Sequence, residues 1–353
     1  MAYLQAPAHA TRWIKLWLIV IGLMVYAMIL VGGATRLTDS GLSITEWDPI
    51  RGALPPIGAE AWAELFDKYK QTAEYQIQNR GMSLGEFKYI FWWEWAHRLF
   101  GRLIGLVAVG GLVVFAVRKW LNGHLFRRLI LLIALGGLQG FIGWWMVASG
   151  IGDTDRIDVA PYRLATHFSL ALLILSLISW TWLDLSKSQP GKNAQSQSSP
   201  VRLIGVCLLA LVALQMAAGA LVAGLDAGRS YTDWPLMAGE FFPSGYIGDL
   251  GVRALFEGRE ATQFNHRILA YTLFAFSAFA AWTLKSTPQR RISQILFGLV
   301  IAQSIWGIIT LVNAAMPLPL PLIHQGLGVL VLLAATRLCW ETINVPSAVV
   351  VEA

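Results

Sequence analysis

The chain has 353 residues, of which 56% are hydrophobic and only 14% charged, and it contains 16 tryptophans and 33 glycines. An ordinary soluble domain carries roughly 25% charged residues and could not bury so much apolar surface. The composition therefore excludes a soluble globular enzyme, a disordered chain and a disulfide scaffold, which leaves an integral membrane protein. In that class a net charge of +6 indicates cytoplasmic Lys and Arg, and not nucleic-acid binding.

Eight apolar runs are long enough to cross a bilayer as helices, which takes about 20 residues each. Continuous runs, unlike alternating ones, disfavour a β-barrel. The predicted fold is an all-α integral membrane protein with eight transmembrane helices. In chain order the runs lie at 13–34, 90–117, 128–149, 162–185, 202–224, 264–284, 292–313 and 320–340.

A polar, Ser/Gln-rich stretch follows the fourth run, and its composition predicts a flexible cytoplasmic linker at 187–200. It divides the chain into an N-terminal four-helix bundle at 1–186 and a C-terminal four-helix bundle at 201–353. The termini and the connections on their side carry 13 basic and three acidic residues, whereas the opposite connections are acidic. By the positive-inside rule both termini are cytoplasmic.

The two halves repeat one another, at an offset of 187 residues in the segment after the first span and at smaller offsets further on. The segment after the first run, Asp39-Ser-Gly-Leu-Ser-Ile-Thr-Glu-Trp47, matches Asp226-Ala-Gly-Arg-Ser-Tyr-Thr-Asp-Trp234 after the fifth. Both halves begin on the same side of the membrane, so we expect a parallel repeat with its axis along the membrane normal. The two bundles should therefore be pseudo-symmetric.

Four of the six histidines fall near the outer ends of predicted spans, at equivalent places in the two halves. They are His97, about seven residues into the second span, then His167, His266 and His324. Intramembrane polar groups mark function by default, although a lone histidine often only bonds a neighbouring helix. No Cys or carboxylate cluster completes a zinc site. Two imidazoles from facing helices suit the iron of a haem, which the apolar bundle can bury.

Arginines near these histidines support a haem, because Arg forms charge-assisted forks with propionates. We expect Arg36, Arg98 and Arg267 to bind the cofactor, the alternative being pairs with outer-loop Asp or snorkelling to the interface. Gln-x-x-x-Gly motifs begin at Gln139, Gln215 and Gln303. Their simplest role is to allow close helix approach.

These residues together resemble the haem A synthase family over residues 12 to 340. The resemblance implies an eight-helix enzyme that oxidises a ring methyl of haem O to a formyl group by successive hydroxylations and loss of water, giving haem A for terminal oxidases. It also implies a resident haem b in the C-terminal bundle, and the branch without a cysteine pair in the first outer loop. The matching motifs are Gly32-Gly-Ala-Thr-Arg36-Leu-Thr-Asp39-Ser-Gly41, Glu94-x-x-His97-Arg98, Gln139-Gly-Phe-Ile-Gly143, Gly219-Ala-Leu-Val-Ala-Gly224, Asn265-His266-Arg267 and His324-Gln.

The halves differ three residues before the first histidine of each. The N-terminal half has Glu94 at this position, and the C-terminal half has the neutral residue Gln263. Positions i and i+3 share a helix face, so Glu94 should project toward the same site as His97. A carboxyl in an apolar site suits proton chemistry. The N-terminal half should thus hold substrate haem O on His97 and His167 and do the chemistry, with Glu94 catalytic. The alternative for Glu94 is a structural salt bridge to Arg98.

Two other functions remain open on the residues alone. Paired histidines also suit a di-haem b electron-transfer cytochrome of the quinol oxidoreductase type, and a haem transporter is a weaker reading. The expected partners are haem O, membrane lipid, an electron-transfer partner and haem O synthase. Residues 1–12 lack the Arg-rich amphipathic pattern of a transit peptide, so a bacterial inner membrane is expected.

Overall fold

The computed structural model describes residues 6–48, 50–152, 154–186 and 199–344. Within these residues the protein is helical and has no β-strand, which confirms the all-α prediction. Most of the predicted linker lies outside the described residues, and its last two positions, Ser199 and Pro200, belong to a helix. The long helices are α1 Ala8–Leu37, α4 Leu84–Val117, α5 Gly123–Val147, α6 Pro161–Ser186, α7 Ser199–Gly224, α9 Arg259–Thr283, α10 Arg290–Val312 and α11 Pro319–Asn344.

Seven of these helices are long and apolar enough to cross a membrane. The remaining long helix, α9, has 25 residues, but its first turns are polar and lower its hydropathy. The eighth span therefore stays a prediction. Exposed apolar side chains run along one face of α4, for example Leu106, Val109 and Val113, which are about half exposed or more. Such a face suits contact with lipid, because soluble proteins rarely expose contiguous apolar surface.

The boundaries of α4 differ from those predicted, because the helix begins at Leu84 and not near residue 90. Ser83 accepts a hydrogen bond from the Glu86 backbone N–H, and the Glu86 carboxylate accepts one from the Ser83 N–H. This capping box starts the helix outside the apolar run. His97 consequently lies 13 residues into the helix, and not seven, so helix start is a poor guide to its depth.

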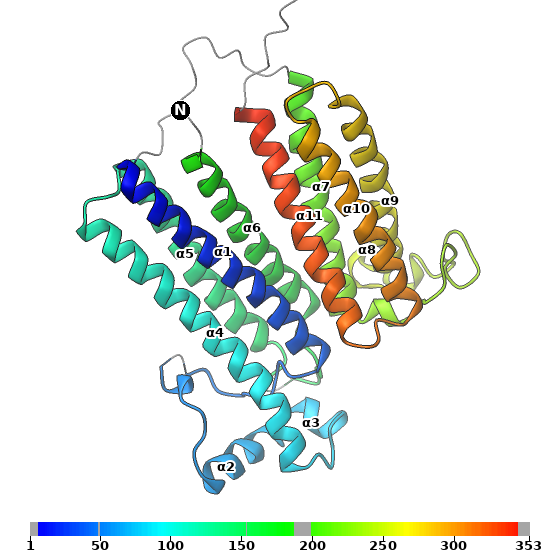
Figure 1. Cartoon of the computed structure of the whole chain (residues 1–353). Coiled ribbons are helices and arrows are strands. Elements are labelled where there is room, and N and C mark those ends of the chain that lie inside the picture. The colour runs from blue at the N-terminus through cyan, green and yellow to red at the C-terminus, as the bar shows by residue number, and fades with distance from the viewer. Residues whose placement is uncertain (1–5, 49, 153, 187–198, 345–353) are drawn as a thin grey trace, which may run out of the picture.

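The long helices pack in a closed order within each half of the chain (Figure 1). Helix α1 packs against α4 and α6, and α5 packs against the same two helices. In the second half α7 and α10 both pack against α9 and α11. The halves meet where α6 contacts α7 and α11, and where α1 contacts α11. Apolar side chains such as Ile14, Leu18, Leu208 and Leu338 fill the core along this seam.

The first residues of α1, the α4–α5 turn and the last turn of α11 lie at one end of the helices, and the long outer connections lie at the other (Figure 1). The connection between α1 and α4 holds a short 3₁₀ helix, Arg51–Ala53, and two further helices, α2 Ala59–Tyr69 and α3 Ala73–Ile77. Aromatic packing fixes α2 on the protruding start of α4, since Trp62 and Phe66 contact Phe87 and Phe91. The second outer connection holds η2 Ala227–Arg229, η3 Gly248–Arg253 and α8 Ala254–Glu257.

Glu74 in α3 is a buried carboxyl, 2% exposed, and its Oε2 atom has no hydrogen-bond partner. Burial raises the pKa of Glu74 from 4.5 to about 8. The negative charges of Glu94, Asp39 and Asp158 raise this pKa further by smaller amounts, and a hydrogen bond from Tyr69 lowers it. The folded protein therefore keeps a proton that the unfolded chain releases above about pH 4.5. The contribution of Glu74 to stability is full below that pH and is lost as the pH rises to about 8.

Glu74→Gln should therefore raise the thermal midpoint of the purified protein at pH 8 and change it little at pH 4.5. Thermal unfolding in detergent across this range measures the difference. A variant with the wild-type midpoint at both pH values would mean that the carboxyl is not protonated in the folded state.

Candidate functional site

The four predicted histidines each lie against a glycine on the neighbouring helix. A Cβ placed on the glycine would stand 3.1 Å or less from the histidine Cε1 atom in every case, so only glycine leaves room for the ring. This contact between a histidine ring and a glycine, called a glycine seat below, therefore occurs four times in the two halves. The pairs are His97 on α4 with Gly32 on α1, His167 on α6 with Gly143 on α5, His266 on α9 with Gly219 on α7, and His324 on α11 with Gly307 on α10.

The glutamines of the Gln-x-x-x-Gly motifs bond the histidine that the glycine seats. The Nε2 group of Gln139 donates to the His167 carbonyl at 3.0 Å, Gln215 donates to the His266 carbonyl at 3.1 Å, and Gln303 to the His324 carbonyl at 3.0 Å. Each amide also contacts a nitrogen of the same ring. The sequence analysis missed these contacts, although the position of Gln one helical turn before the glycine could have indicated them.

The histidines are brought together in two pairs, one in each half. Helices α4 and α6 both pack against α1 and α5, so they lie diagonally across that half, and α9 and α11 are related in the same way. The rings of His97 and His167 are within electrostatic range of one another, as are those of His266 and His324. All four residues are half-buried.

Two imidazoles on diagonal helices fit a metal that brings most of its own ligands. Among the described residues no group of three or more His, Cys, Asp or Glu side chains could hold a bare metal ion. The Nδ1 atoms of His97 and His324 are buried without a hydrogen-bond partner. Unpartnered ring nitrogens, glycine seats and apolar helices together fit a haem, whose porphyrin supplies the remaining ligands.

Glu94 is 3% exposed and its carboxylate accepts hydrogen bonds from the protein on both oxygens. Oε2 accepts from the Ser43 hydroxyl and the Ile44 N–H, each at 2.8 Å. Oε1 accepts two bonds from Arg98, at 2.6 and 3.1 Å. The guanidinium of Arg98 also donates to the carbonyls of Ile44 and Glu46. The pair therefore ties the first outer loop to α4, directly beside His97.

Gln263 and Arg267 tie the second outer loop to α9 in the same manner. The Gln263 amide donates to the carbonyls of Ala227 and Tyr231, both at 2.9 Å. Arg267 donates to backbone carbonyls of the same loop at Asp233 and Leu236. The repeat thus extends from sequence to structure, because each half fastens its outer loop to the turn that carries its histidine.

Arg36 joins the halves through acidic side chains. Its guanidinium lies 2.7 Å from Asp226, 3.0 Å from Asp39 and 3.6 Å from Asp158. Asp39 and Asp226, which the repeat makes equivalent, both have a left-handed backbone, with φ of 46° and 50°. All three arginines expected to bind the cofactor therefore have protein partners, and their contact with a haem stays a prediction.

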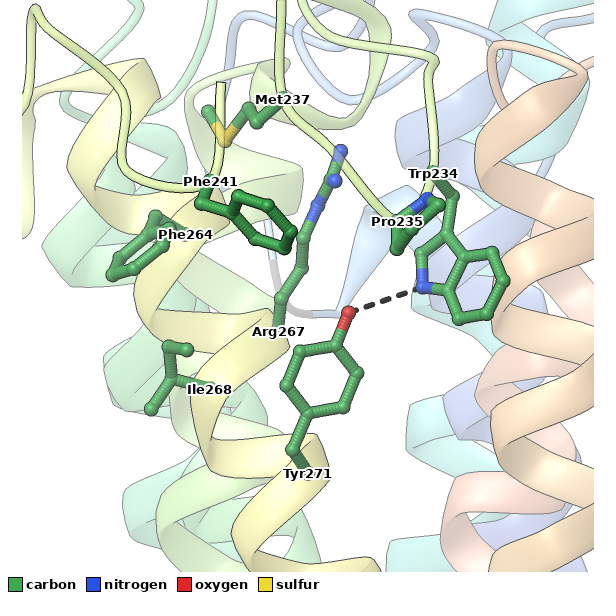
Figure 2. A pocket seen from close by; sticks show the side chains of 8 residues that line it. All are labelled: Trp234, Pro235, Met237, Phe241, Phe264, Arg267, Ile268 and Tyr271. Carbon is green, nitrogen blue, oxygen red and sulfur yellow. Dashed lines mark hydrogen bonds between the residues drawn. The ribbon is translucent and has the colours of Figure 1, made fainter. Parts of the chain in front are cut away.

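A pocket of about 250 Å³ opens beside Arg267, on the outer part of α9 (Figure 2). Trp234 and Pro235 lie on one side of the arginine and Phe241 on the other. The Trp234 indole N–H donates to the hydroxyl of Tyr271 at 3.0 Å, which closes the pocket one turn further along the helix. The pocket is mainly apolar and belongs to the same turn as His266.

The glycine seats can be tested without touching a histidine. In Gly307→Ala the new Cβ would stand 2.8 Å from His324 Cε1, so the ring must move, although a side-chain tip moves at little cost in stability. We expect the folded variant to retain much less haem. Gly298→Ala on the same helix is the control, because a Cβ there meets nothing within 4 Å. Equal haem content in the two purified variants would show that the seat does not position a ligand.

Comparison with known proteins agrees with this arrangement. Residues 15–336 match the COX15-CtaA family, described as cytochrome oxidase assembly protein. The chain belongs to this family. It is 61% identical over 334 residues to a protein named Heme A synthase from Hyphomonas neptunium, covering 94% of this chain and 93% of that protein. Proteins of the same name from Maricaulis maris and Caulobacter vibrioides are 47% and 44% identical, over 95% and 94% of this chain and 98% and 96% of theirs.

The segment that matches the COX15-CtaA family includes all four histidines that lie against a glycine. It also includes the three glutamines that bond to these histidines. The match therefore covers both halves of the repeat, and the candidate site is part of the family's shared region.

Proposed function

We propose that this protein is a haem A synthase, which oxidises a ring methyl of haem O to a formyl group to give haem A for terminal oxidases. The observation that carries the proposal is the pair of glycine-seated histidines in each half, in a chain 61% identical to a protein named Heme A synthase. The enzyme needs two haems at once, one as substrate and one to remove electrons, and the repeated seat provides for two.

The substrate, haem O, is assigned to the N-terminal half, at residues 1–186, with His97 and His167 as its iron ligands. A resident haem b is assigned to the C-terminal half, at residues 201–353, with His266 and His324. This division is supported by a charge difference between the two histidine-bearing turns: Glu94, three residues before His97, stands where the C-terminal half has neutral Gln263. When bound, haem b supplies one-electron transfer.

The residues of the chain have separate tasks in this scheme. The histidines hold iron, and the arginine clamps on Arg98 and Arg267 hold each outer loop against the histidine-bearing turn, which keeps water from the reacting ring. Glu94, whose two oxygens are already surrounded by donors, acts as a fixed negative charge in the N-terminal site. Arg36, Arg98 and Arg267 are the candidate propionate contacts.

We further propose that α9 is the eighth transmembrane helix, and that α1, α4, α5 and α6 form one four-helix bundle and α7, α9, α10 and α11 the other. The closed packing order within each half supports this arrangement. The excess of basic over acidic residues in the termini and in the connections on their side, taken together, supports cytoplasmic termini in a bacterial inner membrane. Reporter fusions after Lys192 and Ala353 should behave as cytoplasmic, and an external signal at the C-terminus would mean an odd number of spans.

Haem O synthase, which must supply the substrate, and an electron-transfer protein or small carrier are the proposed partners, and membrane lipid surrounds the helices. The function is tested by extracting haems from cells that make haem O, with and without this protein, and separating them by chromatography. Haem A should appear only with the protein. A purified protein that holds two haem b and makes no haem A would instead be the di-haem electron-transfer cytochrome, which the paired histidines also suit.

A further inference from the structure

One of the four histidine seats lacks the glutamine that the other three share. His167, His266 and His324 are each bonded by a glutamine that lies four residues before the seating glycine. The seat of His97 is Gly32, and the residue four positions before it is Met28. The repeat offset of 187 residues pairs Gly32 with Gly219 and Met28 with Gln215. Met28 therefore occupies the place of the missing glutamine.

The position of the Met28 side chain agrees with this assignment. Its Cε atom lies 3.6 Å from where a Cβ would stand on Gly101, one turn after His97 on α4. The methionine thus reaches from α1 toward the histidine-bearing helix, as Gln215 reaches from α7 toward α9. It bears no hydrogen-bond donor and only a weak acceptor, so it cannot bond the His97 carbonyl or hold its ring. His97 Nδ1 is buried without a partner.

Each of the three glutamines can restrain the imidazole that it contacts. A histidine that ligates iron through one nitrogen normally donates the N–H of the other to an acceptor, which fixes the ring and raises its basicity. The Oε1 atoms of Gln139, Gln215 and Gln303 are all buried and all without a hydrogen-bond partner. The Nε2 group of each glutamine donates to the histidine carbonyl and contacts the ring, so the amide restrains the imidazole, which Met28 cannot do.

We propose that Met28 makes His97 the weak, exchangeable iron ligand of the protein, through which the substrate haem enters and leaves, whereas the three glutamines fix permanent ligands. The inference rests on the proposed function, because it assumes that substrate haem occupies the N-terminal half. A resident haem is then held by two supported histidines, and a substrate haem by one supported and one unsupported. Met28 is a positioning residue, since it acts only through His97.

Met28→Gln should convert the exchangeable ligand into a fixed one. Loss of a supporting partner usually costs a metal site about 10- to 100-fold in affinity, so the added amide should slow haem release by a similar factor. Purified protein carrying haem b is loaded with haem O, an excess of haem-scavenging apoglobin is added, and the transfer is followed from the Soret band. Met24→Gln, one turn earlier on α1, introduces the same amide away from the seat and should release haem O at the wild-type rate. Release from Met28→Gln at the wild-type rate would overturn the proposal.

The reciprocal variant tests the glutamine without any substrate. Gln215→Met should release haem b to the apoglobin about 10- to 100-fold faster than wild type, and unchanged retention would overturn the supporting role of the amide. His97→Ala tells the two possible failures apart. If haem O binds this variant as firmly as wild type, the placement of substrate in the N-terminal half is wrong, and the role of Met28 falls with it. If binding is lost but Met28→Gln changes nothing, the inference alone is wrong.

Discussion

His266→Ala and His324→Ala should each leave the purified protein with little haem b. Both residues lie on diagonal helices of the C-terminal half, and each imidazole is seated on a glycine and bonded by a glutamine. If the two histidines hold the haem iron as proposed, removing one would take away half of the protein's bonds to it, and alanine leaves a gap beside the seating glycine. The measurement is haem b per protein from the reduced difference spectrum after detergent purification.

His124→Ala is the matched control, because His124 lies at the opposite end of the helices, where its ring contacts only Arg127 among its polar neighbours on α5. It should retain the full haem content. If the His266 and His324 variants both keep the wild-type spectrum while His97→Ala loses it, the resident haem belongs in the N-terminal half and the two assignments must be exchanged.

Glu94→Gln should lower the rate of haem A formation about 10²- to 10⁴-fold and leave haem b in place. The substitution removes the negative charge beside His97 and makes the position resemble Gln263, which holds the equivalent loop with a neutral amide. The haem b ligands lie in the other half, so their site should be undisturbed. The measurement is haem A produced per haem b in membranes supplied with haem O.

The contacts of Glu94 predict a second consequence that must be separated from the first. In Glu94→Gln the new NH₂ group, if it takes the place of Oε2, would face two donors, the Ser43 hydroxyl and the Ile44 N–H. A buried donor left unpaired costs about 1–3 kcal/mol, so the first outer loop should loosen. Ser43→Ala removes one of these bonds and keeps the charge. If loop fastening is all that Glu94 provides, Ser43→Ala and Glu94→Gln should lower activity by similar factors and both should increase protease cleavage of the loop.

If the charge itself matters, Ser43→Ala should lower activity less than Glu94→Gln does, because it keeps the charge and removes one hydrogen bond to the carboxylate, which is worth about 1.5–3 kcal/mol. A normal ratio of haem A to haem b in Glu94→Gln would remove this residue from the chemistry.

Hydropathy and the repeat were sufficient to predict the helical membrane architecture and the four histidines. Burial in a bilayer depends on each residue's own transfer free energy, so a run of apolar residues predicts a helix without knowledge of its neighbours. The common order of the motifs then matches His97 with His266 and His167 with His324, since equivalent segments of a repeat fold alike. The apolar run at 264–284 predicted α9, but the polar first turns of this 25-residue helix keep it from qualifying as a membrane span by hydropathy, unlike the other seven long helices.

Only the tertiary structure decided which polar groups meet. Arg36 was expected near a propionate but pairs with Asp226, 190 residues away, and Arg98 and Arg267 fasten loops through backbone carbonyls. The glutamine contacts, the burial of Glu74 and the place of Met28 were likewise absent from the sequence prediction. A hydrogen bond forms only when two groups have the right distance and orientation. Both depend on how the helices pack and on where the loops fold back against them. The sequence by itself therefore determined the long apolar helices and the four repeated histidines, and the packing of the helices decided how each of those side chains is held.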